Sequence, residues 1–450
     1  MAKPKRIFTC DGCGAQHLKW QGQCPDCGAW NALSETRESG GGARGRRSAL
    51  PRAEITRLDQ IDATDVERIG TGVAELDRVL GGGLVPGSVV LIGGDPGIGK
   101  STLLLMAAAR LGSATRACYV TGEESLDQVG LRAERLTMSD APVELLAETS
   151  VEAILDQLDS QPPGVLIVDS IQTLFSESIE SAPGSVSQLR ESAAQLVRFA
   201  KERGVATVLV GHVTKEGTLA GPRVLEHMVD TVLYFESDIG SRFRIVRSVK
   251  NRFGAANELG FFVMGEQGFK EVKNPSAIFL ARRTEAIAGS TTLVTRESTR
   301  SLLVEVQALV DHNIGSHPRR VAQGLEAQRL NMLLAVLHRH CDIALGDSDV
   351  YANVVGGLRI AETAADLSVT LALLSSFRER PISTDLVTFG EIGLTGEVRP
   401  VPFGEERLAE AAKHGFSRAL IPKGNAPQRS IPGMEIVAVE RLSQALEALF

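Results

Sequence analysis

The sequence has few aromatic residues, no long apolar run and no excess of positive charge. Aromatic residues make up 4% of the 450 positions, so composition does not indicate stacking platforms for nucleic-acid bases. The formal net charge of −7 excludes a globally basic nucleic-acid coat, although it leaves room for a local basic stripe. The N-terminal MAKPKRIFTC has no apolar signal region and no apolar run is long enough to span a bilayer, which predicts a cytoplasmic protein without a membrane partner.

Four of the six cysteines lie near the N-terminus as two CxxC pairs, Cys10 with Cys13 and Cys24 with Cys27. In a reducing compartment, this pattern favours a metal site over a disulfide pair or a redox dithiol. Two such turns supply a tetrahedral shell of four sulfurs for Zn²⁺. Because four protein ligands leave no open position, residues 1–33 are predicted to form a structural zinc knuckle that depends on the metal to fold.

The rest of the chain predicts two larger domains after a linker. The Gly/Ser/Arg-rich stretch 34–54 is typical of a flexible tether. Across 55–272, near-continuous apolar runs alternate with helical patterns, which predicts an α/β domain with a parallel sheet covered on both faces. Its last two runs, FRIVRSV and LGFFVM, have no helix between them and predict an antiparallel extension at one edge. Residues 275–450 are predicted to form an α+β domain with helical patterns at 322–340, 362–379 and 404–414.

The segment GGDPGIGKST has the spacing G-x4-G-K-S/T between an apolar strand and a helical pattern. At such a turn backbone N–H groups converge on a phosphate, Lys100 reaches the β- and γ-oxygens, and the Ser101 hydroxyl ligates Mg²⁺. The sequence therefore predicts a site for ATP and Mg²⁺. The expected cofactor-binding residues are Gly94, Asp95, Pro96, Gly97, Ile98, Gly99, Lys100, Ser101, Thr102, Asp169 and His212.

Polar residues follow three other apolar strands of this domain. Asp169 ends GVLIVDS, where it can bind Mg²⁺ through water; a helix N-cap is the alternative. Glu123 and Glu124 in YVTGEES follow the first strand after the phosphate loop. Either can orient and deprotonate water, with Glu123 as the first choice. His212 ends VLVGH and is a candidate sensor of the γ-phosphate, or else a hydrogen-bonded surface histidine.

The motif KNRFG places Lys250 and Arg252 two residues apart at a strand end, so both project to one side, either as a solvated edge or toward an anion. The chain also contains TGVAELDRVLGGGLVPGSVVLIGGDPGIGKST, GHVTKEGTLAGPR and EIGLTGEVRPV. With the four-cysteine knuckle, these motifs resemble, over essentially the whole length, the bacterial RadA (Sms) family of DNA-repair and branch-migration proteins, whose ATPase core is RecA-like.

The resemblance implies a hexameric ring that hydrolyses ATP and moves on single-stranded DNA within branched recombination intermediates, alongside the RecA recombinase. ATP then binds between neighbouring subunits, and Lys250 and Arg252 reach the nucleotide held next door, aimed by a turn at Gly254. Two Gly/Pro-containing stretches, 176–192 and 214–228, are candidate mobile pore loops. The candidate DNA contacts, each of which could instead be solvated, are Lys215, Arg223, Arg319 and Arg320.

The stretch EIGLTGEVRPV also resembles the Lon protease domain, which uses a Ser–Lys dyad. Ala364 or Ala365 falls where that family has serine, and Glu405 or Glu406 falls where it has lysine. The resemblance therefore implies a Lon-like fold without proteolysis. The missing dyad argues against an ATP-driven protease. The zinc knuckle and Lon-like tail argue against a nucleotide-dependent switch of the circadian-clock-ATPase type.

Overall fold

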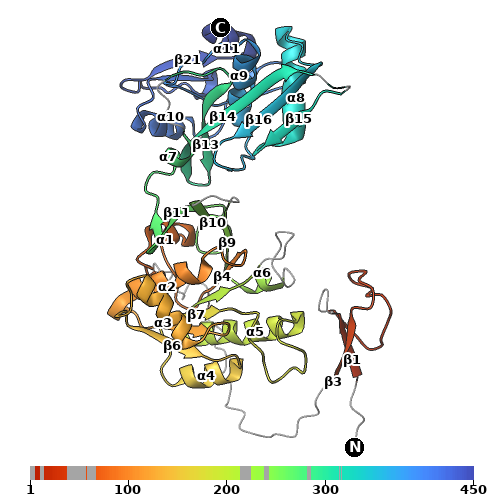
Figure 1. The fold of residues 1–450 in the computed structure, drawn as a ribbon, viewed down its shortest axis with the longest axis vertical. Coiled ribbons are helices and arrows are strands. Elements are labelled where there is room, and N and C mark those ends of the chain that lie inside the picture. Colours follow the sequence, from red (N-terminus) through yellow and green to blue (C-terminus); the bar gives the residue numbers. More distant parts are fainter. Residues whose placement is uncertain are drawn as a thin grey trace, which may run out of the picture. The chain divides into compact units, whose positions relative to one another are not determined.

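The computed structural model describes residues 6–10, 15–37, 57, 67–212, 224–237, 243–280, 285–313, 315 and 317–450. The chain divides into two compact units, Met1–Val272 and Lys273–Phe450, which are described one at a time (Figure 1). Among the helices of these residues, none combines the length and the apolar character needed to cross a bilayer. Residues 38–54 of the predicted linker lie outside the described residues. Its first four residues, 34–37, belong instead to a strand that pairs with the N-terminal strand, because their backbone completes the small sheet there.

The N-terminal segment of the first unit is a small three-stranded antiparallel sheet with the order β2-β1-β3. Its strands are β1 (Arg6–Cys10), β2 (Gln16–His17) and β3 (Leu33–Arg37). Its buried hydrophobic cluster contains only Cys10, Cys24 and Leu33 among the described residues. Because this apolar core is so small, burial alone stabilises the segment weakly.

A nine-stranded sheet forms the centre of the remainder of the first unit, in the order β12-β11-β10-β9-β4-β8-β7-β5-β6. The strands from β9 to β6 pair in parallel, whereas β10, β11 and β12 extend the sheet in antiparallel fashion. This confirms the predicted α/β fold with an antiparallel edge. The strands are β4 (Val89–Gly94), β5 (Ala117–Thr121), β6 (Val143–Ala147), β7 (Val165–Asp169), β8 (Ala206–Val210), β9 (Thr231–Glu236), β10 (Phe243–Asn251), β11 (Leu259–Gly265) and β12 (Gly268–Glu271).

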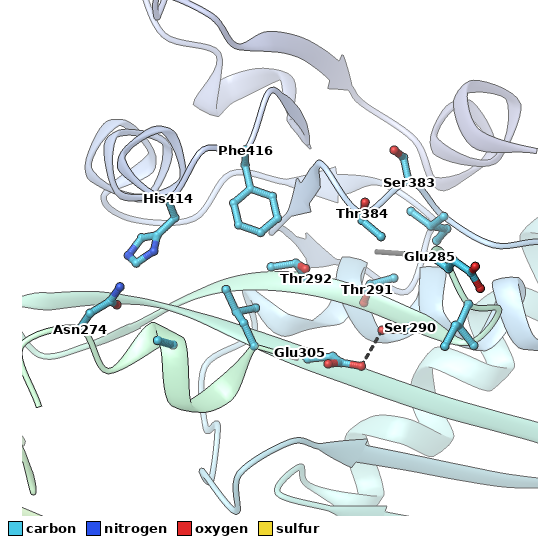
Figure 2. A pocket seen from close by; sticks show the side chains of 14 residues that line it. Asn274, Glu285, Ser290, Thr291, Thr292, Glu305, Ser383, Thr384, His414 and Phe416 are labelled. Carbon is cyan, nitrogen blue, oxygen red and sulfur yellow. Dashed lines mark hydrogen bonds between the residues drawn. The ribbon is translucent and has the colours of Figure 1, made fainter. Parts of the chain in front are cut away.

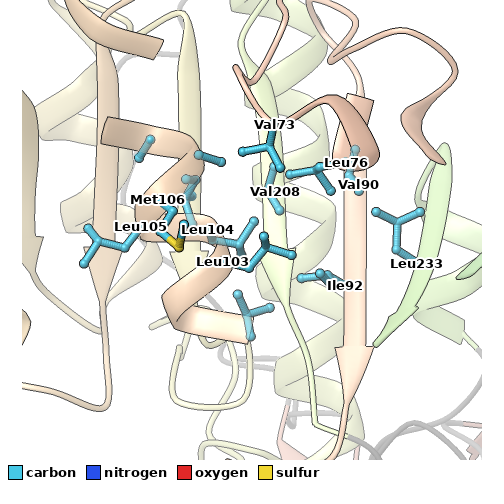
Figure 3. Close-up of a cluster of buried hydrophobic side chains, with 14 of the residues drawn as sticks. Val73, Leu76, Val90, Ile92, Leu103, Leu104, Leu105, Met106, Val208 and Leu233 are labelled. Atoms are coloured by element: carbon cyan, nitrogen blue, oxygen red, sulfur yellow. The ribbon is translucent and has the colours of Figure 1, made fainter. Parts of the chain in front are cut away.

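Helices cover both faces of the parallel strands, because successive strand residues point to opposite sides. Along β4, Val90 and Ile92 pack with α2, as Figure 3 shows, whereas Val89 and Leu91 belong to a second core that includes residues of α4 and α5. All six residues of β4 are buried, as expected of a central parallel strand. The helices are α1 (Ala74–Leu80), α2 (Lys100–Leu111), α3 (Leu126–Arg135), α4 (Val151–Asp159), α5 (Val186–Arg203) and α6 (Val224–Met228), with a 3-10 turn, η2, at Gly112–Ala114.

Serine residues begin three of these helices and fix where they start. The side chains of Ser125, Ser150 and Ser185 each accept a hydrogen bond from a backbone N–H three residues later. Such an N-cap contributes about 1 kcal/mol to helix stability. Helix α5 ends at Gly204, whose φ of +68° lies in the left-handed region that favours glycine.

The second unit contains a seven-stranded mixed sheet in the order β15-β16-β14-β13-β17-β20-β21 and a separate two-stranded ribbon, β18-β19. The helix predicted to begin at 322 begins instead at Ala327, because Arg320–Gln323 pairs in parallel with β16 as edge strand β15. The strands are β13 (Ser290–Glu297), β14 (Arg300–His312), β15 (Arg320–Gln323), β16 (Ser348–Val354), β17 (Leu386–Thr388), β18 (Glu391–Ile392), β19 (Val398–Arg399), β20 (Arg418–Pro422) and β21 (Glu435–Val439). The helices are α7 (Ser276–Phe279), α8 (Ala327–Cys341), α9 (Ala365–Phe377), α10 (Gly404–Lys413) and α11 (Leu442–Leu449), with a 3-10 turn, η3, at Lys423–Asn425.

Candidate nucleotide and metal sites

The phosphate loop joins β4 to α2, and the surrounding atoms explain its glycines. Gly97 and Gly99 have φ angles of +78° and +112°, a conformation that side chains rarely adopt. A Cβ on Gly94 would lie 2.7 Å from the carbonyl oxygen of Phe235, so β4 has no room for a side chain there. Helix α2 then begins at Lys100, and its first backbone N–H groups, which have no partner within the helix, are available to an anion.

The other predicted loop residues have different surroundings. Asp95 and Pro96 are exposed, and Ser101 and Thr102 are half-buried in the first turn of α2. Ile98 is buried in the α2 core, so it can meet a nucleotide only through its backbone.

The side chain of Lys100 is folded against its own loop. Its Nζ donates to the carbonyl oxygens of Gly94 (2.7 Å) and Asp95 (3.0 Å), and lies 3.4 Å from Nδ1 of His212. Burial lowers the pKa of Lys100, although nearby carboxylates, chiefly that of Asp169, oppose this shift. A phosphate would replace the carbonyl partners with full negative charges.

Asp169 ends β7 on the same side of the sheet as the start of α2. Its Oδ2 accepts a 2.5 Å hydrogen bond from the Tyr119 hydroxyl. Asp169 and Ser101 offer oxygen ligands, which Mg²⁺ prefers. The residues present therefore fit the predicted Mg²⁺ site.

Glu123 and Glu124 are adjacent in sequence but their carboxylates have different partners. The Glu123 carboxylate accepts from the Ser170 hydroxyl and, at 3.0 Å, from Nε2–H of His212. Burial would raise the pKa of Glu123, but these bonds and the charge of Lys100 outweigh it and lower the pKa. The Glu124 carboxylate instead pairs with Arg132 of α3. The contacts therefore favour Glu123 as the carboxylate at the phosphate site.

His212 connects the lysine and the carboxylate of this cluster. Its Nε2–H donates to Glu123, which leaves Nδ1 as the acceptor that faces Lys100. The imidazole is thus the link between a phosphate-binding group and a group that could act on water. It ends the described part of the chain that follows β8, since residues 213–223 are outside the description.

Lys250 and Arg252 of KNRFG are close in space but differ in their partners. Lys250 Nζ donates to two backbone carbonyls, those of Glu226 and Val229, both at 2.7 Å. Burial lowers the pKa of Lys250, and the charge of Arg252 lowers it further. Arg252 pairs with Asp230 at 3.1 Å and keeps 54% of its side chain exposed. Arg252 is therefore the more available of the two cations.

The expected role of Gly254 needs a correction. Gly254 does not have a left-handed φ, so a turn that only glycine can adopt is not the reason for its presence. A Cβ there would lie 3.0 Å from Cα of Gly81, the residue that caps α1. Close backbone packing against the end of α1 accounts for this glycine. Arg68 reinforces the contact by donating to the Phe253 carbonyl at 2.6 Å.

The sheet register separates KNRFG from the phosphate loop of the same chain. Asn251 pairs with Thr231, which pairs with Val90 near the start of β4, whereas the phosphate loop leaves the other end of β4 at Gly94. Four residues of strand between these rows span about 13 Å. Arg252 follows Asn251 and therefore lies beyond that row, at the amino edge of the parallel strands, while the phosphate loop lies at their carboxyl edge.

The predicted DNA contacts fare differently. Lys215 and Arg223 lie outside the described residues. The guanidinium of Arg320 donates to the carbonyls of Leu345, Gly346 and Ser348, so it braces its own unit, whereas Arg319 is exposed.

The stretch 176–192, a candidate mobile loop, is held by one buried side chain. The amide of Gln188 donates to the carbonyls of Ser176, Ile179 and Ser181, and accepts from the backbone N–H of Ser176. The Ser176 hydroxyl donates to Glu152 of α4. These contacts give the stretch a defined conformation in this structure, and its role as a mobile pore loop stays a prediction.

The described cysteines of the N-terminal sheet converge as a metal site requires. The Sγ atoms of Cys10 and Cys27 are 3.6 Å apart, and the Sγ of Cys24 belongs to the same cluster. In a tetrahedral shell with Zn–S bonds of about 2.3 Å, sulfurs lie about 3.8 Å apart, so the cluster fits Zn²⁺. Cys13 lies outside the described residues.

The thiol of Cys24 is readily ionised in this cluster. Its burial works against ionisation, but hydrogen bonds from the backbone of Cys27 and Asp26 and from the side chains of His17 and Cys10 lower the pKa to about 6. A thiolate is the form that binds a metal. The two tryptophans, Trp20 and Trp30, are mostly exposed.

In the second unit, the positions that resemble the Lon dyad carry no nucleophile. Ala364 and Ala365 are buried at the start of α9, and Glu405 and Glu406 occupy the first turn of α10. The neighbouring Arg407 is 1% exposed and forms a two-pronged pair with Glu362.

A second ion pair, Asp366 with Arg329, lies at the start of α9. Sequence reasoning missed both arginines, because their partners lie about 40 residues away in the chain.

A cavity of about 240 Å³ also lies in the second unit (Figure 2), remote in sequence from the phosphate loop. Its wall includes the ring of Phe416, His414 and the buried carboxylate of Glu305, which accepts from the Ser290 hydroxyl at 2.8 Å. Hydroxyl groups of Thr292, Ser383 and Thr384 face the same space.

Sequence reasoning also missed two residues of the phosphate site. Tyr119 and Ser170 bond the predicted Asp169 and Glu123, respectively. Ser170 directly follows Asp169, and this adjacency is a signal that could have found it. Tyr119 is two residues before the end of β5. The alternation of side chains along neighbouring parallel strands would place it on the same face of the sheet as Asp169.

Comparison with known families agrees with this arrangement. Residues 54–218 match the family described as AAA domain, residues 8–35 match the Rubredoxin metal binding domain, and residues 299–425 match Subunit ChlI of Mg-chelatase. A RadB recombinase structure has a TM-score of 0.38 at 20% identity and covers 46% of this chain and all of its own. A DnaB-like replicative helicase, solved in a study of its interactions with primase, has a TM-score of 0.42 at 14% identity and covers 48% of this chain and 64% of its own.

The fold and the phosphate site define an ATPase whose α/β core matches the AAA domain, joined to an N-terminal zinc ribbon and a C-terminal ChlI-type domain. Curated relatives named DNA repair protein RadA are similar over the full length. The protein of Pseudomonas aeruginosa is 57% identical over 100% of both chains, that of Escherichia coli 53% over 99% of both, and that of Bacillus subtilis 47% over 99% of both. The chain belongs to the family of DNA repair protein RadA.

Proposed function

We propose that this ATPase is driven by single-stranded DNA and promotes branch migration of recombination intermediates, as a helicase-type motor that works with the RecA recombinase. We further propose that it acts as a homo-oligomeric ring, with a hexamer as the expected size, in the cytoplasm. The ATPase core and the membership of a DNA-repair family support this proposal.

One observation carries the ring assignment: the opposite-edge geometry of KNRFG. Arg252 lies at the amino edge of the parallel strands, more than four strand residues from the phosphate loop of its own chain. A cation at that edge is badly placed for its own nucleotide and well placed to meet one held by a neighbour. Its half-exposed side chain, tethered by Asp230, supports a role as a finger in trans. Lys250, which braces two carbonyls, is proposed to support it.

The residues of the phosphate site divide the chemistry among them. Lys100 exchanges its loop carbonyls for β- and γ-phosphate oxygens. Ser101 and Asp169 hold Mg²⁺, which when bound neutralises charge on the transferred phosphate. Glu123, kept ionised by Ser170 and His212, orients the attacking water and accepts its proton. Arg252 of the neighbour stabilises the charge that develops as the γ-phosphoryl leaves.

His212 is proposed to carry the state of the site to the DNA. Its contact with Lys100 is 3.4 Å in this structure, and a phosphate that draws Lys100 away would change the partners of the imidazole. The chain continues from His212 into the stretch that contains Lys215 and Arg223, which we propose as DNA phosphate contacts, with Arg319 as a further one. These contacts would add salt-sensitive affinity without sequence preference.

The second unit is proposed to lack proteolytic activity and to serve in subunit packing. Alanine at both candidate nucleophile positions and glutamate at both candidate lysine positions support this. Incubation of the protein with unfolded casein and ATP tests it, and cleavage that depends on residues of α9 or α10 would overturn it.

The central test is ATP hydrolysis with and without single-stranded DNA by wild type, Lys100→Ala and Arg252→Ala. Wild type should be stimulated by DNA, and both variants should fail to hydrolyse ATP. Arg203→Ala is the matched control, because Arg203, the last residue of α5, also forms a surface ion pair with an aspartate, Asp159. If DNA does not stimulate the wild type, the proposed DNA dependence is wrong. If Arg252→Ala is fully active, the proposed role of Arg252 in hydrolysis is wrong.

Branch migration is tested separately on joint molecules assembled by RecA from a circular single strand and a homologous duplex. Wild type with ATP should lengthen the heteroduplex, and Lys100→Ala should not. If wild type hydrolyses ATP with DNA stimulation but leaves the junction where it was, the motor assignment is wrong while the ATPase stands.

A further inference from the structure

The inference concerns Tyr119, a buried residue of β5 that no sequence motif singles out. Tyr119 is 1% exposed and belongs to the hydrophobic core under α2. In the register of β5 and β7, Tyr119 pairs with Ile167 and Thr121 pairs with Asp169. Paired residues and residues two apart share a face of the sheet, so Tyr119 and Asp169 point to the same side, toward α2.

The hydroxyl of Tyr119 meets the carboxylate expected at the Mg²⁺ site. It donates to Oδ2 of Asp169 at 2.5 Å. A phenol has one proton, and here that proton goes to the carboxylate. The bond holds the carboxylate in one orientation, and Oδ1 of Asp169 is not engaged by the tyrosine.

Packing alone does not require this hydroxyl. Phenylalanine would fill the same core, and a buried hydroxyl is unfavourable unless it is hydrogen-bonded. The bond that satisfies the phenol of Tyr119 goes to Asp169, the carboxylate of the Mg²⁺ site. The arrangement therefore ties β5 to the end of β7 at the point where the cation must be held.

We propose that Tyr119 is a positioning residue for Mg²⁺: its hydroxyl holds the Asp169 carboxylate so that Oδ1 presents free lone pairs to the cation. It does not touch the metal. This inference rests on the proposed nucleotide site and deepens it, because it identifies what sets the metal affinity of that site. Groups that orient metal ligands typically change metal affinity by about 10- to 100-fold when removed.

The test measures metal binding directly, with ADP and Mn²⁺ as a paramagnetic substitute for Mg²⁺, on the full-length protein. Electron paramagnetic resonance counts free Mn²⁺ as it is titrated into protein saturated with ADP. In Tyr119→Phe, which removes only the hydroxyl, Mn²⁺ should dissociate about tenfold more readily. Binding of ADP in the presence of a chelator should stay as in wild type, because the lost hydrogen bond goes to Asp169, a proposed metal ligand.

Two controls make the result decisive. Tyr351→Phe makes the same chemical change in the second unit and should leave Mn²⁺ affinity unchanged. In an Asp169→Ala background, adding Tyr119→Phe should have a much smaller effect, because the group that it orients has gone.

The possible results separate this inference from the proposed function. If wild type with ADP does not bind Mn²⁺, the proposed nucleotide site itself fails. If wild type binds Mn²⁺ and Tyr119→Phe binds it equally well, the site stands and the role of Tyr119 is wrong. An equal loss in the presence and absence of Asp169 would also overturn it, since the tyrosine would then act through general stability.

Discussion

Equal mixing of two inactive variants, Lys100→Ala and Arg252→Ala, should restore ATP hydrolysis. If KNRFG serves the neighbour's nucleotide, a working site needs Lys100 from one chain and Arg252 from the next. In randomly mixed rings with head-to-tail contacts, each site meets both conditions with a probability of one half apiece, so activity should return to about a quarter of wild type. Either variant alone should be reduced about 10³- to 10⁵-fold for loss of the finger, and comparably for loss of the lysine.

A second mixture gives an independent measure of trans against cis action, because the two models predict different fractions of wild-type activity. Wild type mixed equally with the double variant Lys100→Ala/Arg252→Ala leaves about a quarter of the sites intact if they are shared, but about half if each chain works alone. Steady-state phosphate release measures both mixtures, and labelled subunits must first be shown to exchange. Exchange with no recovery in the first mixture and half activity in the second would refute the argument from sheet register.

The tether of Arg252 gives this prediction a graded variant. Asp230 accepts from Arg252 at 3.1 Å and, through its other oxygen, from the backbone N–H of Val89 at 3.1 Å. Asp230→Asn keeps the shape but loses the charge that aims the guanidinium. A mis-aimed finger should lower kcat by up to about 100-fold while leaving nucleotide binding unchanged. Fluorescent-nucleotide titration beside phosphate release separates the two, and a loss confined to binding would contradict it.

Three further predictions concern other parts of the chain. Ser170→Ala removes a donor that lowers the pKa of Glu123, so the acid limb of the pH profile of kcat should move to higher pH, because activity is lost as pH falls through that pKa. Arg407→Ala leaves a carboxylate without its buried partner and should lower the free energy of unfolding of the second unit by about 3 to 5 kcal/mol in urea melts, whereas exposed Arg399→Ala should cost about 0 to 1 kcal/mol. Chelation of zinc should unfold the N-terminal sheet and change the tryptophan fluorescence. This signal reports the N-terminal segment alone, because the segment contains both tryptophans of the chain. An unchanged spectrum after zinc release would contradict a structural role of the metal.

The sequence predicts the core fold well because its signals are local. Buried parallel strands give continuous apolar runs, and the phosphate loop keeps all of its essential groups within ten residues, from Gly93 to Thr102. The two CxxC pairs are equally local. The helix predicted at 322 was wrong in its first turn, because strand β15 forms only by pairing with β16, which lies about 30 residues further along.

The partners of the site residues could not be predicted in the same way. The sequence makes Glu123 the first choice over the adjacent Glu124, and the positions of Ser170, His212 and Arg132 supply the physical basis for that choice. These partners come from β7, from the end of β8 and from α3, so their meeting depends on the order of strands in the sheet. Local spacing contains no information on that order.

For KNRFG, the sheet register says more about where the two cations act than the sequence motif does. The spacing of its two cations is consistent with a solvated edge or with an anion site, and it assigns equal roles to Lys250 and Arg252. Their contacts break this equality, since Lys250 is committed to two carbonyls while Arg252 retains an exposed guanidinium on a single acidic tether. The pairing of Asn251, Thr231 and Val90 then fixes the edge at which that guanidinium lies. Because the phosphate loop leaves the opposite edge, we propose that the nucleotide served by Arg252 is held by another copy of the chain.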